Sequence, residues 1–390
     1  MPGHSLRKTI LQIVVAALAW RALTAVAAFL VNVVFPIGPT GELFTVRART
    51  HFIWDTFARW DSGWYFTIAR YGYEWVEGGR SNIAFFPLYP LLMRYLGLAF
   101  GGGRVNLFLA GIIISWASFV LAMVMLYRLA KVELGDDEER ARHALVYAAV
   151  FPFAFFFGVV YTESLFLLLS VTAFYGFRTR RWMLGAVAGA LATATRANGV
   201  FMVPALALVA WREARGGDRR TLLLASVAVA FTLAGVGSYS LYVYSVSGHP
   251  FEWANTMARW NWQPGSTAGW QPLAQLVVAL ATRPYEHLTG SPQRVFDLMN
   301  AAAGIALLVA TPFIWRRFGI AYALLILVNL YVPLSSGALE GVGRYAAVLF
   351  PFPLWLATIE SRTIRAGLLA TFGMFYGIGL AMFTKVYPLY

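Results

Sequence analysis

The chain has 390 residues, of which 59% are hydrophobic and only 13% are charged, and its mean hydropathy is +0.63. A soluble globular protein has about 25% charged residues, so this composition excludes a soluble globule and indicates a membrane protein. The formal net charge of +13 would suggest nucleic-acid binding in a soluble protein. Here most arginines lie at the ends of apolar segments, which is typical of membrane topology, and we expect no nucleic-acid partner.

Residue types that several kinds of chemistry require are missing or scattered. The chain has no cysteine, which excludes disulfides, thiolate metal ligands and a cysteine nucleophile. Its five histidines show no metal-ligand spacing such as His-Glu-x-x-His. We therefore expect that no cofactor is required, with a divalent metal as an open alternative. Only Lys8, Lys131 and Lys385 are lysines among the 31 basic residues, an arginine bias that suggests a bacterial source.

The first apolar segment follows Arg7 and Lys8 and extends to Pro36. A secretory signal is an alternative, because Ala25-Val26-Ala27 resembles a cleavage site, but the apolar run is longer than a signal core. We interpret the segment as a membrane helix that starts in the cytoplasm, since basic residues precede it. Arg21 lies inside this span and is expected to pair internally or to reach the interface rather than to act in catalysis.

Further apolar segments follow, and together they predict an all-α, polytopic transmembrane bundle of about eleven helices. They cover residues 105–127, 144–160, 163–177, 182–197, 199–211, 221–246, 296–315, 319–334, 344–359 and 366–383. Alternating spans place the short basic loops in the cytoplasm and two long loops outside, 37–104 and 247–295. We predict one transmembrane domain over residues 1–390 in a bacterial cytoplasmic membrane, with interfacial helices in the first loop and the active site on the extracytoplasmic side.

Asp61 is the most informative acidic residue of the first outer loop. If its surroundings form one helix, Asp61 lies in an apolar stripe of about 100°. That stripe comprises Trp54, Phe57, Asp61, Trp64, Ile68 and Tyr71. A carboxylate on such a face must be paired, neutralised or functional, because burying an unpartnered charge costs several kcal/mol. The alternative is that Asp61 caps the next turn or pairs with Arg59 or Arg70.

Three other acidic residues of this loop are expected to have structural or surface roles. Asp55 projects to a different side of the helix from Asp61, so the two carboxylates do not form a local pair, and Asp55 is expected to be an N-cap or a surface charge. Glu74 and Glu77 lie among glycines, which indicates a solvated loop.

Several short motifs occur in a characteristic order along the chain. They are Arg59-Trp60-Asp61 with Tyr65-Phe66, Gly72-Tyr73, Ala84 to Pro90, Tyr161 to Phe166, Thr195 to Gly199, Gly248 to Phe251 leading to Trp260, and Gly343-Arg344-Tyr345 before Phe350-Pro351. In this order and with this outward placement, they resemble the PIG-V type of mannosyltransferase, a family of GT-C glycosyltransferases. The similarity covers most of the chain.

The resemblance implies an inverting transferase that moves mannose or a related hexose from a polyprenyl-phosphate sugar to an acceptor hydroxyl at the outer face of the membrane. One carboxylate suffices as general base, and the family position of Asp61 implies that role. Guanidinium groups can stabilise the departing phosphate, for which Arg196 and Arg344 are expected. The alternatives are that Arg196 pairs with Glu163 across adjacent helix ends and that Arg344 is a boundary anchor.

The remaining expected site residues are assigned to the donor and the acceptor. Glu163, Asn198 and Tyr345 are expected near the donor phosphate or sugar, with Glu163 alternatively orienting an arginine or simply lying at the interface. Sugar or acceptor contacts are expected from Trp60, Tyr65, Tyr161, His249 and Trp260. Tyrosine and tryptophan, however, also populate membrane interfaces generally.

The partners expected are membrane lipids, the polyprenyl-phosphate-mannose donor and a glycolipid, glycan or protein acceptor. The alternative functions are a lipid-linked sugar transporter or flippase, and another GT-C transferase such as a pentosyl or glycan transferase. A transporter should place ionisable residues near the middle of the membrane and show repeat symmetry. This chain concentrates them in the outer loops.

Overall fold

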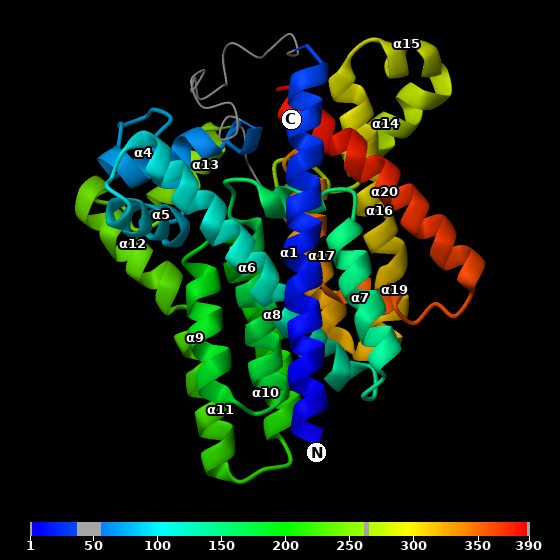
Figure 1. The fold of residues 1–390 in the computed structure, drawn as a ribbon. Coiled ribbons are helices and arrows are strands. Elements are labelled where there is room, and N and C mark those ends of the chain that lie inside the picture. The colour runs from blue at the N-terminus through cyan, green and yellow to red at the C-terminus, as the bar shows by residue number, and fades with distance from the viewer. Residues whose placement is uncertain (1, 37–55, 261–264, 388–390) are drawn as a thin grey trace.

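The computed structural model describes residues 2–36, 56–260 and 265–387 and is an assembly of helices (Figure 1). Helices account for 78% of the structure, and the described residues form no β-strand. The expected all-α fold class is therefore confirmed. In lipid such a fold is favoured because each helix satisfies its own backbone hydrogen bonds.

Five helical segments of the described chain are long and apolar enough to cross a membrane. They are α1 (Pro2–Val34), α6 (Arg104–Glu133), the consecutive α11 (Arg219–Phe231) and α12 (Ala234–Ser247), α16 (Pro292–Phe318) and α20 (Arg362–Thr384). Their apolar spans are 23 to 30 residues long, or about 35 to 45 Å, whereas the hydrocarbon core of a bilayer is about 30 Å thick. The chain is therefore an integral membrane protein.

Shorter helices fill the bundle between these spans. They are α7 (Glu138–Val150), η2 (Ala154–Gly158), α8 (Glu163–Arg178), α9 (Trp182–Thr193), η3 (Ala197–Met202), α10 (Val203–Ala214), α17 (Ile320–Leu334), α18 (Val342–Ala347) and α19 (Pro351–Leu356). Four expected spans are wrong as single helices. Residues 144–160 divide at Pro152 and residues 344–359 divide before Pro351, because proline lacks the N–H that would continue a helix. Residues 199–211 divide between η3 and α10, and residues 221–246 divide between α11 and α12.

The two long loops expected from the sequence contain short helices at the end of the bundle opposite the N-terminus (Figure 1). They are α4 (Ser62–Tyr71), η1 (Asn82–Ala84), α5 (Leu88–Ala99), α13 (Glu252–Arg259), α14 (Gln271–Thr282) and α15 (Pro284–Thr289). Two segments far apart in sequence thus meet at one end of the molecule, and this end carries the residues singled out above.

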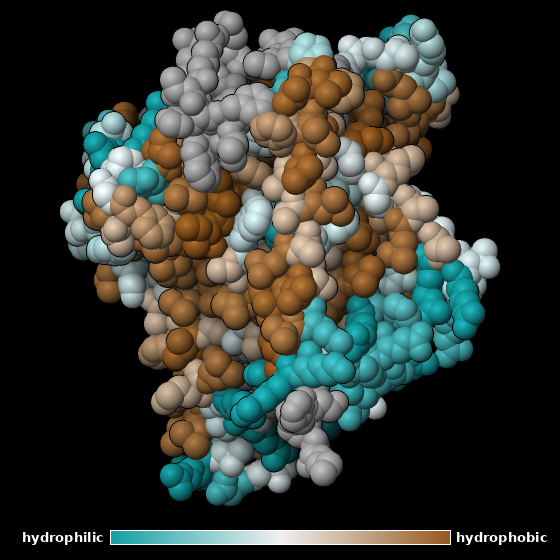
Figure 2. Space-filling view, viewed as in Figure 1, coloured by the Kyte–Doolittle hydropathy of each residue, from teal (hydrophilic) through white to brown (hydrophobic). Residues whose placement is uncertain are grey.

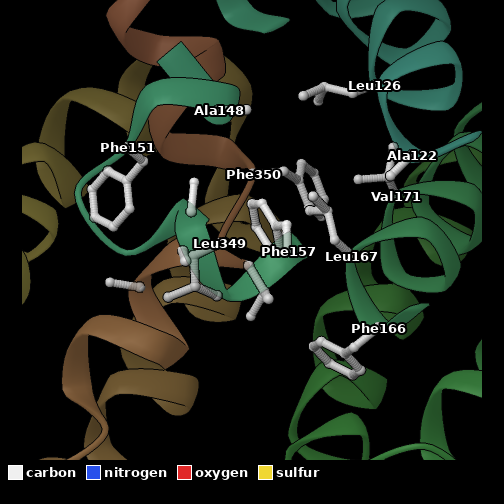
Figure 3. Packing of buried hydrophobic residues seen from close by; sticks show 14 of the residues in the cluster. Ala122, Leu126, Ala148, Phe151, Phe157, Phe166, Leu167, Val171, Leu349 and Phe350 are labelled. Atoms are coloured by element: carbon white, nitrogen blue, oxygen red, sulfur yellow. The ribbon is translucent and has the colours of Figure 1, made fainter. Parts of the chain in front are cut away.

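The core is built around α6 and α8, with the phenylalanine-rich segment of η2 beside them. Figure 3 shows Phe157 and Phe350 converging with Leu167 of α8 in this cluster, and all three side chains are buried. Where α8 meets α9, a methyl group added to Gly176 would lie 2.4 Å from the backbone nitrogen of Gly185. Small residues at such contacts let membrane helices approach closely, which gives the bundle a rigid centre.

Arg21 is fully buried in the middle of α1 and pairs internally, as expected. Its Nη1 donates to the carbonyl oxygen of Ala154 at 3.4 Å and its Nη2 donates to the hydroxyl of Tyr376 at 3.1 Å. The guanidinium also lies 4.3 Å from the centre of the Phe119 ring. These contacts join three segments of the bundle and compensate a charge that would otherwise be costly in the membrane.

The surface of the bundle matches a membrane environment. In Figure 2 apolar side chains cover the middle of the visible face, and hydrophilic side chains gather toward the end where α1 begins. Exposed apolar residues on α1 and α11 add to the apolar surface, among them Leu11, Val15, Leu23, Val26, Leu223 and Val227. Single exposed leucines are ordinary, but a broad apolar area of this kind indicates contact with lipid.

Candidate active site

A cavity of about 240 Å³ lies beneath α4 and α13 and collects residues from five distant parts of the chain. Nine of the residues expected at the site line it, namely Trp60, Asp61, Tyr65, Tyr161, Arg196, Asn198, Trp260, Arg344 and Tyr345. The polar residues converge on its floor, and aromatic residues form much of its wall. This arrangement is a concave site with a few convergent polar groups, the usual form of a small-molecule or active site.

Asp61 stands at the start of α4, not in the middle of a helix. The helix begins at Ser62 with Asp61 as its N-cap residue, so the projection that placed Asp61 in a helical apolar stripe is wrong. The Asp61 side chain makes no capping hydrogen bond. Its backbone N–H donates to the hydroxyl of Tyr161 at 3.3 Å. The Asp61 side chain is therefore left to face the cavity. Trp54 and Asp55, also considered in that projection, lie outside the described residues.

The turn before α4 is strained and held in place. Trp60 has a φ of 52°, in the left-handed region, which costs a non-glycine residue about 1 to 3 kcal/mol. The Ser62 hydroxyl donates to the carbonyl oxygen of Val160 at 3.1 Å and accepts the Arg59 N–H at 3.2 Å. A backbone bond of 3.0 Å from the Val160 N–H to the Phe57 carbonyl adds a second link. These contacts fasten Asp61 to the segment that precedes α8.

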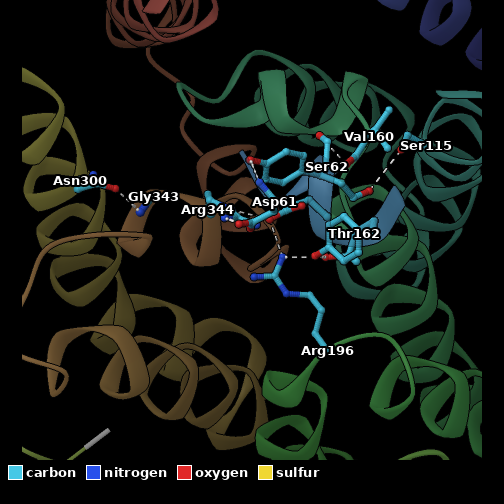
Figure 4. Close-up of polar contacts among 12 residues, drawn as sticks. Asp61, Ser62, Ser115, Val160, Thr162, Arg196, Asn300, Gly343 and Arg344 are labelled. Atoms are coloured by element: carbon cyan, nitrogen blue, oxygen red, sulfur yellow. Dashed lines mark hydrogen bonds and ion pairs between the residues drawn. The ribbon is translucent and has the colours of Figure 1, made fainter. Parts of the chain in front are cut away.

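Four charged side chains form one network at the floor of the cavity (Figure 4). Arg344 bridges two carboxylates, with Nη1 2.8 Å from Asp61 Oδ2 and Nε 2.8 Å from Glu163 Oε1. Arg196 Nη1 lies 2.6 Å from the same Glu163 oxygen. Glu163 has no exposed surface and sits behind the two arginines, so it orients them. The two positive and two negative formal charges cancel.

The partner of Asp61 is thus an arginine 283 residues away, and neither of the local arginines considered from the sequence. Arg70 donates to the carbonyl oxygen of Gly102 at 2.6 Å, and Arg59 is buried and donates to the carbonyl oxygen of Thr384 at 3.2 Å. The ion pair between Arg196 and Glu163, weighed as an alternative to phosphate binding, is present. Arg344 forms ion pairs with both Asp61 and Glu163, so it links two acidic residues of the site in addition to any role as an anchor at the membrane boundary.

The position of Arg344 depends on two glycines. Gly341 precedes α18 with a φ of 76°, a conformation that glycine adopts without strain. A methyl group on Gly343 would lie 2.2 Å from the ring of the buried Phe153, so only glycine fits there. The Gly343 N–H also donates to Asn300 Oδ1 at 2.8 Å. Together these contacts set α18 so that the Arg344 guanidinium lies 4.6 Å from the centre of the Tyr161 ring.

Asn198 presents unused hydrogen-bonding groups to the cavity. Its side chain is buried, and neither its Oδ1 nor its Nδ2 has a hydrogen-bond partner among the described residues. Buried amides are nearly always hydrogen-bonded, so this residue is suited to a ligand or ordered water. Arg196 is the N-cap residue of the same short helix, η3, and its guanidinium lies 5.3 Å from the centre of the Tyr345 ring.

Aromatic side chains enclose the outer part of the cavity. Trp260 meets Trp64 edge to face with ring centres 4.9 Å apart, and its Nε1 donates to the carbonyl oxygen of Ser81 at 3.3 Å. Tyr65 packs against Phe85 with ring centres 5.5 Å apart. Burial and the charges of Asp61 and Glu163 raise the pKa of Tyr65, so its hydroxyl stays protonated. Such a wall offers flat apolar faces together with a neutral donor.

Glu340 also lines the cavity and was not expected from the sequence. Burial and the charge of Asp61 raise its pKa to about 7, although Arg344 opposes the shift. Glu340 belongs to none of the family motifs. The sequence feature that could have pointed to it is its isolation, since it is the only acidic residue between Asp297 and Glu360. It adds a third carboxyl group to the site, one that changes charge near neutral pH.

Not every expected residue reaches the cavity. His249 lies exposed in the turn between α12 and α13, where its N–H donates to Ser247 Oγ, and it is absent from the cavity wall. Glu74 and Glu77 are exposed in the loop after α4, as expected. Trp262, a neighbour of Trp260, lies outside the described residues.

A solved structure with a similar arrangement of helices identifies the fold. ArnT from Cupriavidus metallidurans, solved bound to undecaprenyl phosphate, matches with a TM-score of 0.52 at 12% identity, covering 95% of this chain and 76% of that one. The Archaeoglobus fulgidus oligosaccharyltransferase in its apo form matches with a TM-score of 0.47 at 14% identity, and the match covers 95% of this chain but 56% of that protein. A search of curated proteins gives no match. The likeness to ArnT identifies the GT-C fold.

The sequence itself matches the family model described as mannosyltransferase (PIG-V) over residues 8–214. That stretch is 207 of the 390 residues and contains Asp61, Glu163, Arg196 and Asn198. With the fold, the membrane spans and this match in agreement, the chain belongs to the PIG-V mannosyltransferase family of membrane glycosyltransferases.

Proposed function

We propose that this protein is an inverting glycosyltransferase that moves mannose, or a related hexose, from a polyprenyl-phosphate sugar to an acceptor hydroxyl. Family membership supports the sugar, and the undecaprenyl phosphate in the ArnT structure supports the lipid donor. One observation carries the proposal. A carboxylate, Asp61, and two guanidinium groups, Arg196 and Arg344, share the floor of one cavity.

Asp61 acts as the general base. Its side chain is 30% exposed, and only Oδ2 is engaged by Arg344, so Oδ1 is available to accept the acceptor's proton. The acceptor oxygen attacks the anomeric carbon as the bond from that carbon to the phosphate oxygen breaks on the opposite face, which inverts the configuration. Proton removal by a positioned base contributes about 10² to 10⁴ in rate.

Arg344 and Arg196 stabilise the departing polyprenyl phosphate. Glu163 anchors both guanidinium groups, and Arg344 Nη2 makes no hydrogen bond within the described chain, so it can donate to a phosphate oxygen. Preorganised charged donors are effective because they need no rearrangement as the charge develops. The unpaired amide of Asn198 is placed to hydrogen-bond the transferred sugar, and Trp260 offers a ring face to it.

The proposed reaction takes place at the outer face of a bacterial cytoplasmic membrane. Helix α1 runs from the N-terminal end of the bundle toward the end that contains α4 and α13 (Figure 1). Arg7 and Lys8 precede its apolar part, which favours a cytoplasmic N-terminus and an extracytoplasmic cavity. In this proposal residues 1–390 form one transferase domain, in which loop 37–104 supplies the base and loop 247–295 supplies Trp260. No cofactor is required.

The test uses the purified full-length protein in lipid nanodiscs with undecaprenyl-phosphate [³H]mannose, and follows both transfer and release of mannose to water. Asp61→Asn should lower kcat by about 10² to 10⁴. Glu77→Gln, which changes an exposed carboxylate of the same loop, should leave it unchanged. An Asp61→Asn enzyme with more than a third of wild-type turnover would exclude Asp61 as the base. A wild-type protein that neither transfers nor hydrolyses any lipid-linked sugar would favour transport.

A further inference from the structure

A second cavity of about 340 Å³ adjoins the first. Its walls come from α14, α15, the first turns of α16 and residues 337–340, and Glu340 lines both cavities. The second cavity therefore begins at the wall of the first that lies beside Arg344 and Gly341. Glu340 is thus a carboxyl-bearing residue common to both cavities.

Polar side chains gather in this cavity without hydrogen-bond partners among the described residues. Its polar lining consists of Gln275, His287, Gln293, Asp297 and Glu340. None of these five side chains makes a hydrogen bond or a close ion pair within the part of the chain that the structure describes, and His287 Nε2 is buried without a partner. Such groups gathered around one hollow are typical of a site whose hydrogen bonds are completed by a ligand or by water.

The lining also indicates the chemistry of the ligand. Two amides, two carboxyl groups and an imidazole supply both donors and acceptors, and Leu276 and Leu339 add small apolar patches. No arginine or lysine lines the cavity, so it is not built for a phosphate. Across the described residues no three acidic or histidine side chains group closely enough for a metal ion. A molecule with many hydroxyl groups and small apolar C–H faces fits this lining best.

We propose that the second cavity binds the acceptor of the reaction as a sugar or other polyol, with Glu340 guiding one of its hydroxyl groups toward Asp61. This inference rests on the proposed function of Asp61. The hydroxyl proton passes to Asp61, the hydroxyl oxygen bonds to the anomeric carbon of the donor, and the polyprenyl phosphate leaves with the electron pair of the broken bond. Glu340 and Asp61 interact electrostatically, in keeping with carboxyl groups that face a common centre.

Two variants test the cavity at positions away from the first one. Asp297→Asn and Gln293→Ala each remove hydrogen bonds proposed for the acceptor but leave the charge network of Arg344 intact. With methyl α-D-mannopyranoside as acceptor, each should raise the acceptor KM about tenfold and change kcat less than about twofold, as expected for one or two lost hydrogen bonds. Glu286→Gln is the matched control, because this α15 carboxylate is 72% exposed and does not line the cavity.

Saturation-transfer NMR on the same proteins measures sugar binding without turnover, and mannose release to water measures Asp61 chemistry without an acceptor. If the methyl α-D-mannopyranoside signal of wild type is lost in Asp297→Asn, the second cavity binds the sugar, whether or not the enzyme turns over. Absence of both transfer and hydrolysis in wild type would refute the proposed function and leave this inference standing. An unchanged acceptor KM in both variants overturns the inference. It is also overturned if wild type hydrolyses the donor but shows no saturation transfer with methyl α-D-mannopyranoside, methyl α-D-glucopyranoside or myo-inositol.

Discussion

Replacing Arg344 with lysine tests whether the geometry of the guanidinium group, and not only its charge, supports catalysis. Arg344 makes two charge-assisted contacts of 2.8 Å, from Nη1 to Asp61 and from Nε to Glu163. A lysine ammonium has one nitrogen and cannot keep the planar fork that spans both carboxylates. We therefore expect Arg344→Lys to fold with its charge preserved and to lose at least one of these contacts.

The size of the effect follows from those contacts. A hydrogen bond to a charged group contributes about 1.5 to 3 kcal/mol, and each 1.4 kcal/mol changes a rate or binding constant tenfold. Loss of one contact should thus lower kcat/KM for mannose transfer about 10- to 100-fold. The assay is transfer from undecaprenyl-phosphate [³H]mannose in nanodiscs, and the control is Arg283→Lys, since that arginine is 76% exposed and outside the cavity.

A second comparison tests whether Arg344 acts through Asp61. In an Asp61→Asn background, Arg344→Lys should lower kcat/KM by a much smaller factor than it does in wild type, because the effects of contacting residues are not additive. If Arg344→Lys retains kcat/KM within about threefold of wild type, the bridge is unimportant for the reaction. If its cost is the same in both backgrounds, Arg344 acts independently of Asp61.

Two further predictions concern the residues on either side of Arg344. Gly343→Ala places a methyl group 2.2 Å from the Phe153 ring, so it should destabilise the protein by about 1 to 3 kcal/mol and lower mannose transfer. Thermal unfolding in detergent and the transfer assay measure the two effects. An unchanged Tm together with unchanged activity would show that α18 adapts freely. Glu340, with a pKa of about 7, is neutral at lower pH and negative above, whereas the four charges of the network already cancel. Ionisation of Glu340 near Asp61 and Arg344 should therefore repel the anionic donor, so the wild-type donor KM rises severalfold between about pH 6 and 8. In Glu340→Gln the donor KM should not change over this pH range. An identical pH profile in the two proteins would show that ionisation of Glu340 does not cause the change.

Part of the candidate site could be predicted from local sequence. Arg196 and Glu163 lie at the ends of neighbouring apolar segments, so a hairpin brings them together and their pairing was foreseeable. The alternation of basic and long loops predicts an outward placement of Asp61. The local structure around Asp61 could not be predicted in this way. The projection assumed one continuous helix, whereas Trp60 has a left-handed backbone conformation and α4 begins only after Asp61. Local pattern does not reveal such a turn when tertiary contacts to Val160 and Tyr161 hold it.

By itself the sequence determined that this chain lies in a membrane and that it is helical, because hydrophobicity and charge are summed over many residues and need no partner. Only the tertiary structure decided which arginine faces Asp61, that Glu163 stands behind both arginines and that Glu340 joins two cavities. Those facts depend on contacts between segments as much as 283 residues apart. Chain packing sets such contacts, and no periodicity or spacing within a single segment encodes them.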